Sequence, residues 1–243
     1  MLVLTLNVHD PDDHKLPALA AFLDESGAEL IALTECRRRS AEALAERLGC
    51  VGFAHAHAPH WGNALLTRTL EVDAGSAIDL PPSRLGETRS AAIGAVHGDG
   101  WTAPFVVTHL DYGAESVRRK QMRHLLEALP RGGNECVLMG DLNALARTDY
   151  DEVRWARITA ARERASLSPP TSELVDWLRD ELGFVDAQHD ADAFAPTCRY
   201  GTRVDYVLVG GRCQLQPVAR TYRVLGAMER GLSDHDAISV ELA

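Results

Sequence analysis

Short apolar runs of strand length recur along this chain, and they restrict its fold more than any other feature. The runs cover residues 2–8, 29–35, 63–68, 90–97, 104–110, 136–143, 203–210 and 237–242. Segments with the apolar period of a helix lie between several of them, at residues 15–27, 38–49, 115–129 and 171–183. Consecutive runs without a helix between them must pair antiparallel, whereas runs joined by a helix can pair in parallel. The order of elements therefore predicts an α/β fold with mixed sheets.

The length of the chain fits one domain. Its 243 residues are 46% hydrophobic and 25% charged, which is ordinary for a globular protein with a large core. We predict a single domain over residues 1–243. An Arg-rich segment at about residues 147–170, closed by Pro169 and Pro170, interrupts the pattern and predicts an added helix. This insert is interpreted either as a solvated helix or as a lid over the strand end that precedes it.

The net charge and the spacing of the cysteines argue against several classes of protein. A net charge of −10, from 35 acidic and 25 basic side chains, does not fit a protein that grips nucleic acid by charge alone. A local basic groove or bound divalent cations would still admit a nuclease. The five cysteines are scattered and form no C-x-x-C pair, so they are interpreted as buried thiols. No apolar stretch approaches the roughly 18 residues of a membrane span. With a strand-like N-terminus in place of a signal peptide, we expect a cytoplasmic monomer.

Polar side chains repeatedly follow or precede the apolar runs. They are Asn7, Glu35, His109, Asp141, Asn143, Asp205, Asp234 and His235. Each alone has an ordinary explanation as a turn former, a cap or a packed histidine. Asp141 and Asn143 are two residues apart in "GDLN" and would point to the same side of an extended strand. The whole set would converge if two sheets pack face to face with aligned ends, and such a cluster is the default active-site hypothesis in an α/β protein.

The residue types in this set favour one kind of chemistry. Carboxylates without nearby thiolates favour a hard cation, Mg²⁺ or Mn²⁺, over zinc. A hard cation with histidines and amide donors suits transfer of a phosphoryl group to water. The chain has neither a nucleophile elbow nor a Gly-rich phosphate loop of the G-x-x-x-x-G-K-S type. Direct attack by water is therefore favoured over a covalent intermediate.

The order of the motifs resembles one family. The segments "LTLNVH", "IALTEC", "GNALLTR", "VVTHLD", "RRKQMRHLL", "VLMGDLNA", "GTRVDYVLV" and "LSDHDAISVEL" follow the order found in the endonuclease/exonuclease/phosphatase superfamily. The match runs nearly from end to end. It implies a four-layer α/β/β/α sandwich, in which two mixed sheets pack face to face and the helices cover the outer faces.

The resemblance also implies roles for the metal and phosphate ligands. Glu35 would be the principal metal ligand, with Asn7 beside it holding metal or phosphate. Asp234 would help to position the metal. Asn143 would donate a hydrogen bond to the scissile phosphate.

The remaining roles implied by the resemblance concern protons. Asp141 would orient or deprotonate the attacking water. His235 would bond the phosphate or act as an acid or base, held in the right tautomer by Asp205. His109 would assist the leaving group or steady the phosphate.

Three further residues are kept as candidate substrate contacts. Trp61 can stack on a base, a sugar or a lipid edge, or pack on the rim of a sheet. Asn63 can reach the site or form a turn, and Arg118 can contact substrate or tie its helix to neighbouring structure. His55, His57 and His60 suggest a zinc site, but no fourth ligand is nearby, and zinc is disfavoured.

The predicted function is hydrolysis of a phosphodiester by a divalent-metal-dependent enzyme, and a nuclease acting on DNA or RNA is the first expectation. Two histidines suit protonation of a poor alkoxide leaving group. The alternative is a phosphatase or phosphodiesterase for a small-molecule, inositol or lipid phosphoester. A catalytically inactive binding relative is the third possibility, and the intact set of acids argues against it.

Overall fold

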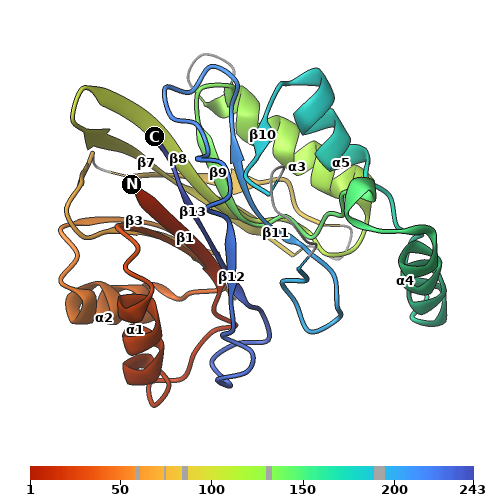
Figure 1. Ribbon diagram of the computed structural model, residues 1–243, viewed down its shortest axis with the longest axis horizontal. Coiled ribbons are helices and arrows are strands. Elements are labelled where there is room, and N and C mark those ends of the chain that lie inside the picture. The colour runs from red at the N-terminus through yellow and green to blue at the C-terminus, as the bar shows by residue number, and fades with distance from the viewer. Residues whose placement is uncertain (59–60, 74, 84–86, 130–132, 189–194) are drawn as a thin grey trace.

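Two mixed β-sheets form the centre of the computed structural model, which describes residues 1–58, 61–73, 75–83, 87–129, 133–188 and 195–243 (Figure 1). The first sheet has the strand order β12 (Arg223–Leu225), β13 (Ala237–Glu241), β1 (Leu2–Asn7), β2 (Leu30–Thr34), β4 (Asn63–Thr67) and β3 (Gly52–Ala56). The second has the order β10 (Val185–Asp186), β11 (Asp205–Val209), β9 (Val137–Asp141), β8 (Trp101–His109), β7 (Arg89–Gly98) and β5 (Glu71–Val72), and β6 (Ser76–Leu80) also pairs with β7. The prediction of mixed sheets is confirmed.

Helices join the two parallel strand pairs, and all of those described except α4 pack on the outer faces of the sheets. They are α1 (Leu16–Glu25), α2 (Arg38–Leu48), α3 (Glu115–Ala128), α4 (Glu152–Arg164) and α5 (Glu173–Asp176). A 3₁₀ turn (Arg147–Asp149) precedes α4, and a π-helical turn (Trp177–Glu181) continues α5. Helix α1 connects β1 to the parallel β2, and α3 connects β8 to the parallel β9. Both connections are long enough for a helical crossover, as parallel pairing requires.

Three hydrophobic clusters define the four layers. The central cluster, with Phe105 and Val207 from one sheet and Val3 and Leu65 from the other, lies between the sheets. A second cluster packs α1 and α2 against the outer face of the first sheet, and a third packs α3 and α5 against the second sheet. Apolar residues therefore alternate toward two cores along each central strand, which accounts for the nearly continuous apolar runs in the sequence.

The differences from the predicted elements have local causes. All eight apolar runs form strands, but β3, β5, β6, β10 and β12 were not predicted. Strand β3 carries the sequence "GFAHA", in which glycine and histidine hide the apolar alternation, and β5, β10 and β12 are only two or three residues long. The insert contains the predicted helix, α4, which Figure 1 shows projecting from one end of the molecule. Among the described residues, no helix is long and apolar enough to cross a membrane.

Candidate functional site

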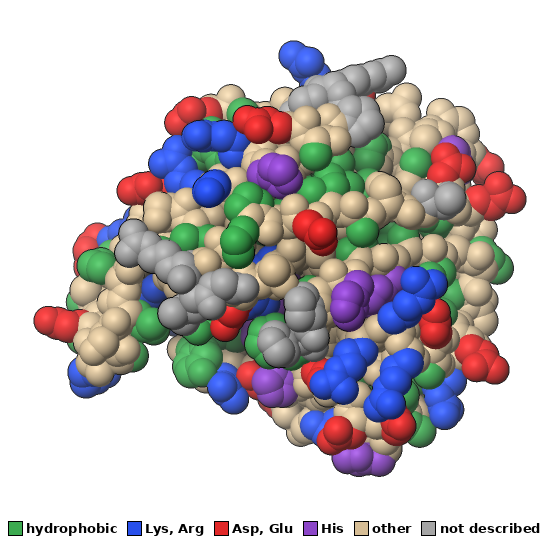
Figure 2. Space-filling model, turned by 180° about the vertical axis from the view of Figure 1, so that it is seen from behind, with side chains coloured by type: hydrophobic (Ala, Val, Ile, Leu, Met, Phe, Trp, Pro, Cys, Tyr) green, Lys and Arg blue, Asp and Glu red, His purple; other side chains and the backbone are tan. Residues whose placement is uncertain are grey.

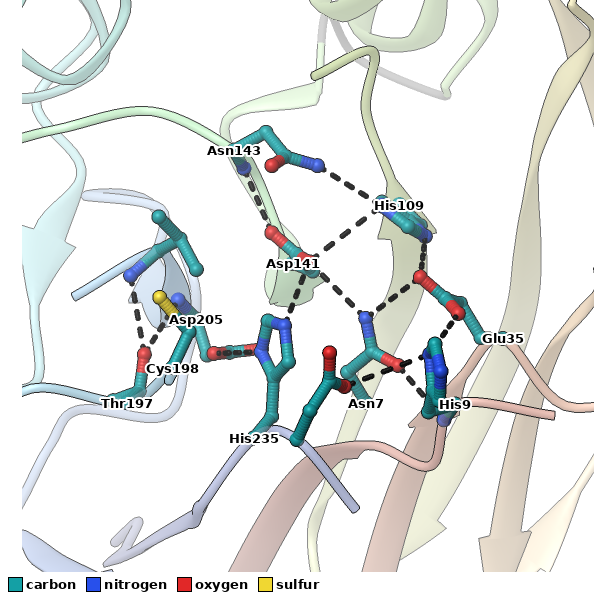
Figure 3. A network of polar contacts seen from close by, with 12 residues as sticks. Asn7, His9, Glu35, His109, Asp141, Asn143, Thr197, Cys198, Asp205 and His235 are labelled. Atoms are coloured by element: carbon teal, nitrogen blue, oxygen red, sulfur yellow. Dashed lines mark hydrogen bonds and ion pairs between the residues drawn. The ribbon is translucent and has the colours of Figure 1, made fainter. Parts of the chain in front are cut away.

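The candidate site lies where the carboxyl ends of β1, β2, β8 and β9 meet. In the strand registers Asn7 is paired with Thr34, and Asp141 is paired with both His109 and Asp205. Strands β1 and β2 lie against β8 and β9 across the central core, so the two sets of strand ends face each other. Figure 3 shows that the polar side chains at these ends point toward one another. The predicted convergence is present.

Strained turns lead the chain away from the strands at this point. Glu35, Asn143 and His9 have φ values of 51°, 49° and 50°, in the left-handed region. A residue other than glycine in this region costs on the order of 1–3 kcal/mol, and such residues concentrate at functional sites. The turn at Asn143 is held because its backbone N–H donates to Asp141 Oδ1 at 2.9 Å. Two of the predicted site residues are thus fixed by local geometry that the rest of the fold supports.

Gly140 is required by the close approach of β9 to β8. Its φ is +125°, and a Cβ built at this position would lie 2.2 Å from the backbone oxygen of Thr108. We expect Gly140→Ala to lower the free energy of unfolding by about 3 kcal/mol or more, because the backbone strain and the clash add. Urea unfolding will measure this, with Gly27→Ala as a control. Gly27 shares a positive φ of +69° but its added Cβ would meet nothing within 4 Å. Equal losses in the two variants would show that the close approach is unimportant.

Asp141 lies at the centre of the group. Its Oδ2 accepts a hydrogen bond from Asn7 Nδ2 at 3.2 Å, and the same amide donates to Glu35 Oε1 at 3.1 Å. Burial, followed by repulsion from Asp205, raises the pKa of the Asp141 carboxyl to about 7. His235 and the amides of Asn7 and Asn143 act in the opposite direction. A carboxyl that titrates near neutrality can both accept and release a proton at physiological pH.

His109 lies on one side of Asp141. Its Nε2 is 2.9 Å from Asn143 Nδ2 and 3.5 Å from Asp141 Oδ2, and its Nδ1 is 3.1 Å from a terminal nitrogen of Arg89. Burial, with the charge of Arg89 and then that of His235, holds the pKa of His109 well below its usual range. The imidazole is therefore neutral at pH 7.

His235 lies on the other side of Asp141 and has the opposite electrostatic environment. Its Nδ1 is 2.8 Å from Oδ2 of the fully buried Asp205, and its Nε2 is 3.9 Å from Asp141 Oδ2. Burial alone would lower the pKa of His235, but the carboxylates of Asp205 and Asp141 outweigh it and raise the value to about 11. His235 is thus a cation at neutral pH, with its tautomer and orientation set by Asp205.

Thr197 positions this histidine–aspartate pair from a loop. Its hydroxyl oxygen accepts hydrogen bonds from the backbone N–H groups of Val204 and Asp205 at 3.1 and 3.2 Å. Its carbonyl accepts from the backbone N–H of Asp236 at 2.8 Å, next to His235. No motif in the sequence marked Thr197, because its hydrogen bonds are to the backbone of the segments that carry Asp205 and His235.

The oxygen atoms around Glu35 fit a hard divalent cation. Glu35, Asp141 and Asp205 are buried carboxylates in one cluster, and Asp234 Oδ1 is a buried oxygen without a hydrogen-bond partner among the described residues. Four carboxylates this close repel one another, and a cation relieves the repulsion. Carboxylate and amide oxygens are the ligands that Mg²⁺ prefers.

A second ligand combination is available in the same cluster. Ligand atoms of Asp141, Asp205 and His235 lie within 4.8 Å of one another. This set fits a cation less well, because His235 is already bonded to Asp205 and carries a proton, and a metal ligand must be the neutral imidazole. The set around Glu35, with Asn7 and Asp234, is the better match to the donor chemistry.

The structure places two of the three predicted substrate contacts, Trp61 and Asn63, beside the site. Trp61 lies beside the site, with its ring stacked on that of His109 at 6.2 Å between centroids and 19° between planes. Asn63 is buried at the start of β4, and its Nδ2 donates to Ser90 O at 2.8 Å. Arg118 is not brought to the site.

Arg118 instead ties α3 to its surroundings. Its guanidinium donates to Glu115 Oε2 at 2.6 and 2.9 Å and to Asp111 O at 3.1 Å, and only 3% of the residue is exposed. The structural interpretation of Arg118 is the one that fits these contacts, and the substrate role is withdrawn. His55 is likewise engaged, with Nε2 3.0 Å from Cys36 O, and His60 lies outside the described residues. Nothing described here supports the zinc interpretation.

Three basic residues join the site that the sequence did not place there. His9 Nδ1 is 3.3 Å from Glu35 Oε2 and 3.5 Å from Asp234 Oδ1. Arg199 lies 3.3 Å from Asp234 Oδ2, and Arg89 contacts His109. The sequence held one signal, and it concerned His9. This residue follows Asn7 by two positions, the same spacing as that from Asp141 to Asn143.

Comparison with known proteins agrees with this geometry. A model of the Endonuclease/Exonuclease/phosphatase family matches residues 4–235. The chain belongs to this family. No curated protein matched the chain. The matched residues include every one of the polar residues that meet at the site.

Solved structures of the family share the fold at low sequence identity. A functionally unknown conserved protein from Enterococcus faecalis V583 is 19% identical, with a TM-score of 0.75 over 100% of this chain and 99% of the other. The mannosyl-6-phosphatase Bt3783 of Bacteroides thetaiotaomicron is 16% identical, with a TM-score of 0.73 over 100% and 99%. TDP2 of D. rerio, in complex with a single-strand DNA product, is 15% identical, with a TM-score of 0.69 over 100% and 98%. The predicted α/β sandwich is confirmed, and the family's members are phosphoesterases.

Proposed function

We propose that this protein is a divalent-metal-dependent phosphoesterase that hydrolyses its substrate by direct attack of water. The observation that supports this best is the arrangement around Asp141. A buried carboxyl whose pKa is about 7 lies between a neutral histidine, His109, and a cationic one, His235. The carboxyl of Asp141 can act as a base, the cationic His235 as an acid, and the neutral His109 as a hydrogen-bond donor, all within a few ångströms.

The roles follow from these charges. Asp141 accepts a proton from the attacking water, and His235 donates to a phosphate oxygen or to the leaving oxygen. Asn143 and His109 hold the phosphate, and Asp205 keeps the imidazole of His235 oriented. Hydrogen-bond donors fixed before the reaction stabilise the charge that develops on the phosphate oxygens.

Glu35, Asn7 and Asp234 are the residues that would hold Mg²⁺ or Mn²⁺. When bound, such a cation would withdraw charge from a phosphate oxygen and help to orient the ester. His9 would support this set, because its imidazole contacts both Glu35 and Asp234. A protein ligand that is held by a neighbouring side chain keeps the geometry that its metal needs.

The reaction is compatible with two classes of substrate. A nuclease is the function expected from the sequence, and the DNA product in the TDP2 structure shows that this fold accepts a nucleic acid in that relative. A small phosphoester is favoured by the surface charge. Basic and acidic side chains are interspersed on the face in Figure 2. Arg37, Arg38 and Arg39, which are three consecutive arginines, pair with Asp10, Glu42 and Asp13.

Metal removal is the direct test of the proposed reaction. Plasmid DNA, single-stranded DNA, RNA and small phosphate esters are incubated at fixed low salt with Mg²⁺, Mn²⁺ or EDTA. We expect turnover with either cation and a loss of at least about 100-fold in EDTA, because the carboxylate cluster then lacks its counter-charge. Glu35→Gln is expected to weaken the response to added Mg²⁺, with the exposed Glu46→Gln as its control. Full activity in EDTA would contradict the metal-dependent proposal. The cytoplasmic location and the monomeric state stay predictions.

A further inference from the structure

A buried arginine on β7, Arg89, contacts the imidazole of His109. Only 5% of Arg89 is exposed, and one of its terminal nitrogens lies 3.1 Å from His109 Nδ1. A guanidinium has five N–H donors, no acceptor and a permanent positive charge. His109 Nδ1 therefore accepts this hydrogen bond and carries no hydrogen of its own. The single hydrogen of the imidazole is then on Nε2, which defines one of its two tautomers.

The surroundings of Arg89 keep this donor in place. Arg89 begins β7 and His109 ends β8, and the two strands are paired antiparallel. The guanidinium carbon lies 5.1 Å from the ring centroid of Trp61, and the same ring stacks on His109. The second terminal nitrogen of Arg89 lies 3.7 Å from Glu87 Oε2. The guanidinium cannot turn away from Nδ1 without giving up these contacts.

The opposite tautomer would place a hydrogen on Nδ1, and Glu35 is the residue that could accept it. Glu35 Oε1 is 3.5 Å from His109 Nδ1, farther than Arg89, and it already accepts a hydrogen bond from Asn7 Nδ2 at 3.1 Å. An Nδ1–H group would also face the Arg89 cation, so that two donors would oppose each other in a buried position. Hydrogen bonds to a charged group are about twice as strong as neutral ones. The Nε2–H tautomer is the more stable of the two.

The Nε2–H tautomer leaves two donors side by side just beyond the end of β9. Asn143 Nδ2 is 2.9 Å from His109 Nε2, and the same amide nitrogen donates to Leu110 O at 3.1 Å. The contact with Leu110 turns the nitrogen end of the amide, and not its oxygen, toward His109. Two N–H groups this close satisfy neither donor, which is unfavourable for groups that are removed from water. Figure 3 shows both side chains next to Asp141.

One oxygen atom can satisfy both donors. An acceptor that lies about 2.9 Å from each nitrogen forms a normal hydrogen bond with both. A phosphate oxygen suits this place, because it is anionic and forms strong hydrogen bonds with N–H donors. Asp141 Oδ2 is 3.5 Å from His109 Nε2, so an oxygen held there would bring the phosphorus close to the carboxyl that activates the water.

We propose that Arg89 is a positioning residue, which fixes the Nε2–H tautomer of His109 so that His109 and Asn143 donate together to one oxygen of the substrate phosphate. This inference rests on the proposed phosphoesterase function and adds to it a residue that acts through His109 and does not touch the substrate. Donors that are fixed before the phosphate arrives need no reorganisation during the reaction. Of the two roles that the family resemblance implies for His109, the contact with Arg89 favours steadying the phosphate.

NMR of the histidine side chains tests the tautomer without any turnover. The protein is labelled with ¹⁵N in its ten histidines, and the signals lost in His109→Gln identify the His109 ring. Two-bond ¹H–¹⁵N correlation spectra distinguish the ring nitrogen that carries a hydrogen from the one that does not. We expect the hydrogen on Nε2 in the wild type, and on Nδ1 in Arg89→Met, where Glu35 and Asn143 are the partners that remain. A hydrogen on Nδ1 in the wild type, or an unchanged tautomer in Arg89→Met, would overturn the proposal.

Kinetics of the variants test whether Arg89 acts through His109. Arg89→Met is expected to lower kcat/KM by about 10- to 100-fold for the ester that is hydrolysed fastest in the metal-removal assay, as is usual when a side chain that orients a site residue is lost. Arg212→Met, at an exposed position, is the matched control. In the double variant with His109→Gln, the loss of Arg89 should add no further effect. A double variant that combines the two single losses in full would mean that Arg89 acts independently, and it would contradict the proposal.

Binding of inorganic phosphate tests the shared oxygen. With Mg²⁺ and increasing phosphate, the Nε2–H signal of His109 and the side-chain amide signal of Asn143 should shift with the same midpoint, while the exposed His14 should not shift. A shift of neither signal, or of only one, would refute the shared oxygen. These NMR experiments need no turnover, so they still decide on Arg89 if the wild type hydrolyses no ester and the phosphoesterase proposal fails by itself.

Discussion

Replacing His235 by alanine is expected to lower kcat by about 10²–10⁴-fold, the contribution of a positioned acid or base. The imidazole is 2.8 Å from the buried carboxylate of Asp205, and the pKa of His235 is raised to about 11, so it carries a proton throughout the neutral range. Its free Nε2 lies 3.9 Å from Asp141 Oδ2, on the side where the phosphate would bind. Alanine removes both the proton donor and the positive charge.

Two further variants test whether the loss of activity is specific to the His235–Asp205 pair. Asp205→Asn should also lower kcat, because the imidazole loses the partner that keeps it oriented and protonated. His14→Ala is the control, since His14 is on the surface with 74% of its side chain exposed. Steady-state kinetics with saturating Mg²⁺ will measure the three variants, and thermal unfolding will confirm that each is folded. A His235→Ala enzyme within about threefold of the wild-type kcat would remove His235 from the mechanism.

Replacing Arg203 by methionine is expected to lower the free energy of unfolding by about 3–5 kcal/mol, a large part of the roughly 5–15 kcal/mol of a typical domain. Arg203 is 1% exposed, and its guanidinium bonds Asp186 Oδ2 and Asp149 Oδ2, both at 2.7 Å. It also lies 4.1 Å from the ring centroid of Tyr206. Methionine fills part of the space but leaves the carboxylates of Asp186 and Asp149 without the guanidinium that they share.

Loss of Arg203 is also expected to loosen the attachment of the insert and the segment that carries Asp205. Asp149 belongs to the 3₁₀ turn that precedes α4, and Arg203 is two residues before Asp205. Urea unfolding, followed by circular dichroism, will measure the loss, with the exposed Arg212→Met as control. A change within about 0.5 kcal/mol, the range of ordinary surface substitutions, would contradict the structural role that we assign to this ion-pair network.

The sequence predicted the parts of the fold and site that depend on repeated patterns. Apolar runs such as 136–143 became central strands, and the polar residues at their ends converged because parallel crossovers bring carboxyl ends to one edge. Asp141 and Asn143 do lie together at the site, but the local backbone geometry differs from the extended strand that was predicted. Asp141 ends β9, whereas Asn143 follows it in a left-handed turn, so strand alternation was not the reason for their proximity.

Contacts that depend on strand register or on the choice of a side-chain partner could not be predicted in the same way. Arg89 is 20 residues from His109 in the sequence, and their contact depends on the register of β7 and β8. Arg118 seemed available for substrate because the sequence does not show that Glu115, one turn earlier, would bind its guanidinium at 2.6 Å. The contact of Arg89 with His109 follows from tertiary packing and not from local pattern.

The central claim is that the group around Asp141 hydrolyses a phosphoester by direct attack of water. Turnover in ¹⁸O-labelled water, with Mg²⁺, tests it most directly when wild type and Asp141→Asn are compared. The account predicts that ¹⁸O enters the phosphate-bearing product and not the alcohol, and that Asp141→Asn loses at least about 100-fold in rate. Label in the alcohol would mean that a carbon–oxygen bond is broken, and an Asp141→Asn enzyme with wild-type rate would show that this carboxyl is not the base. Either result would contradict the account.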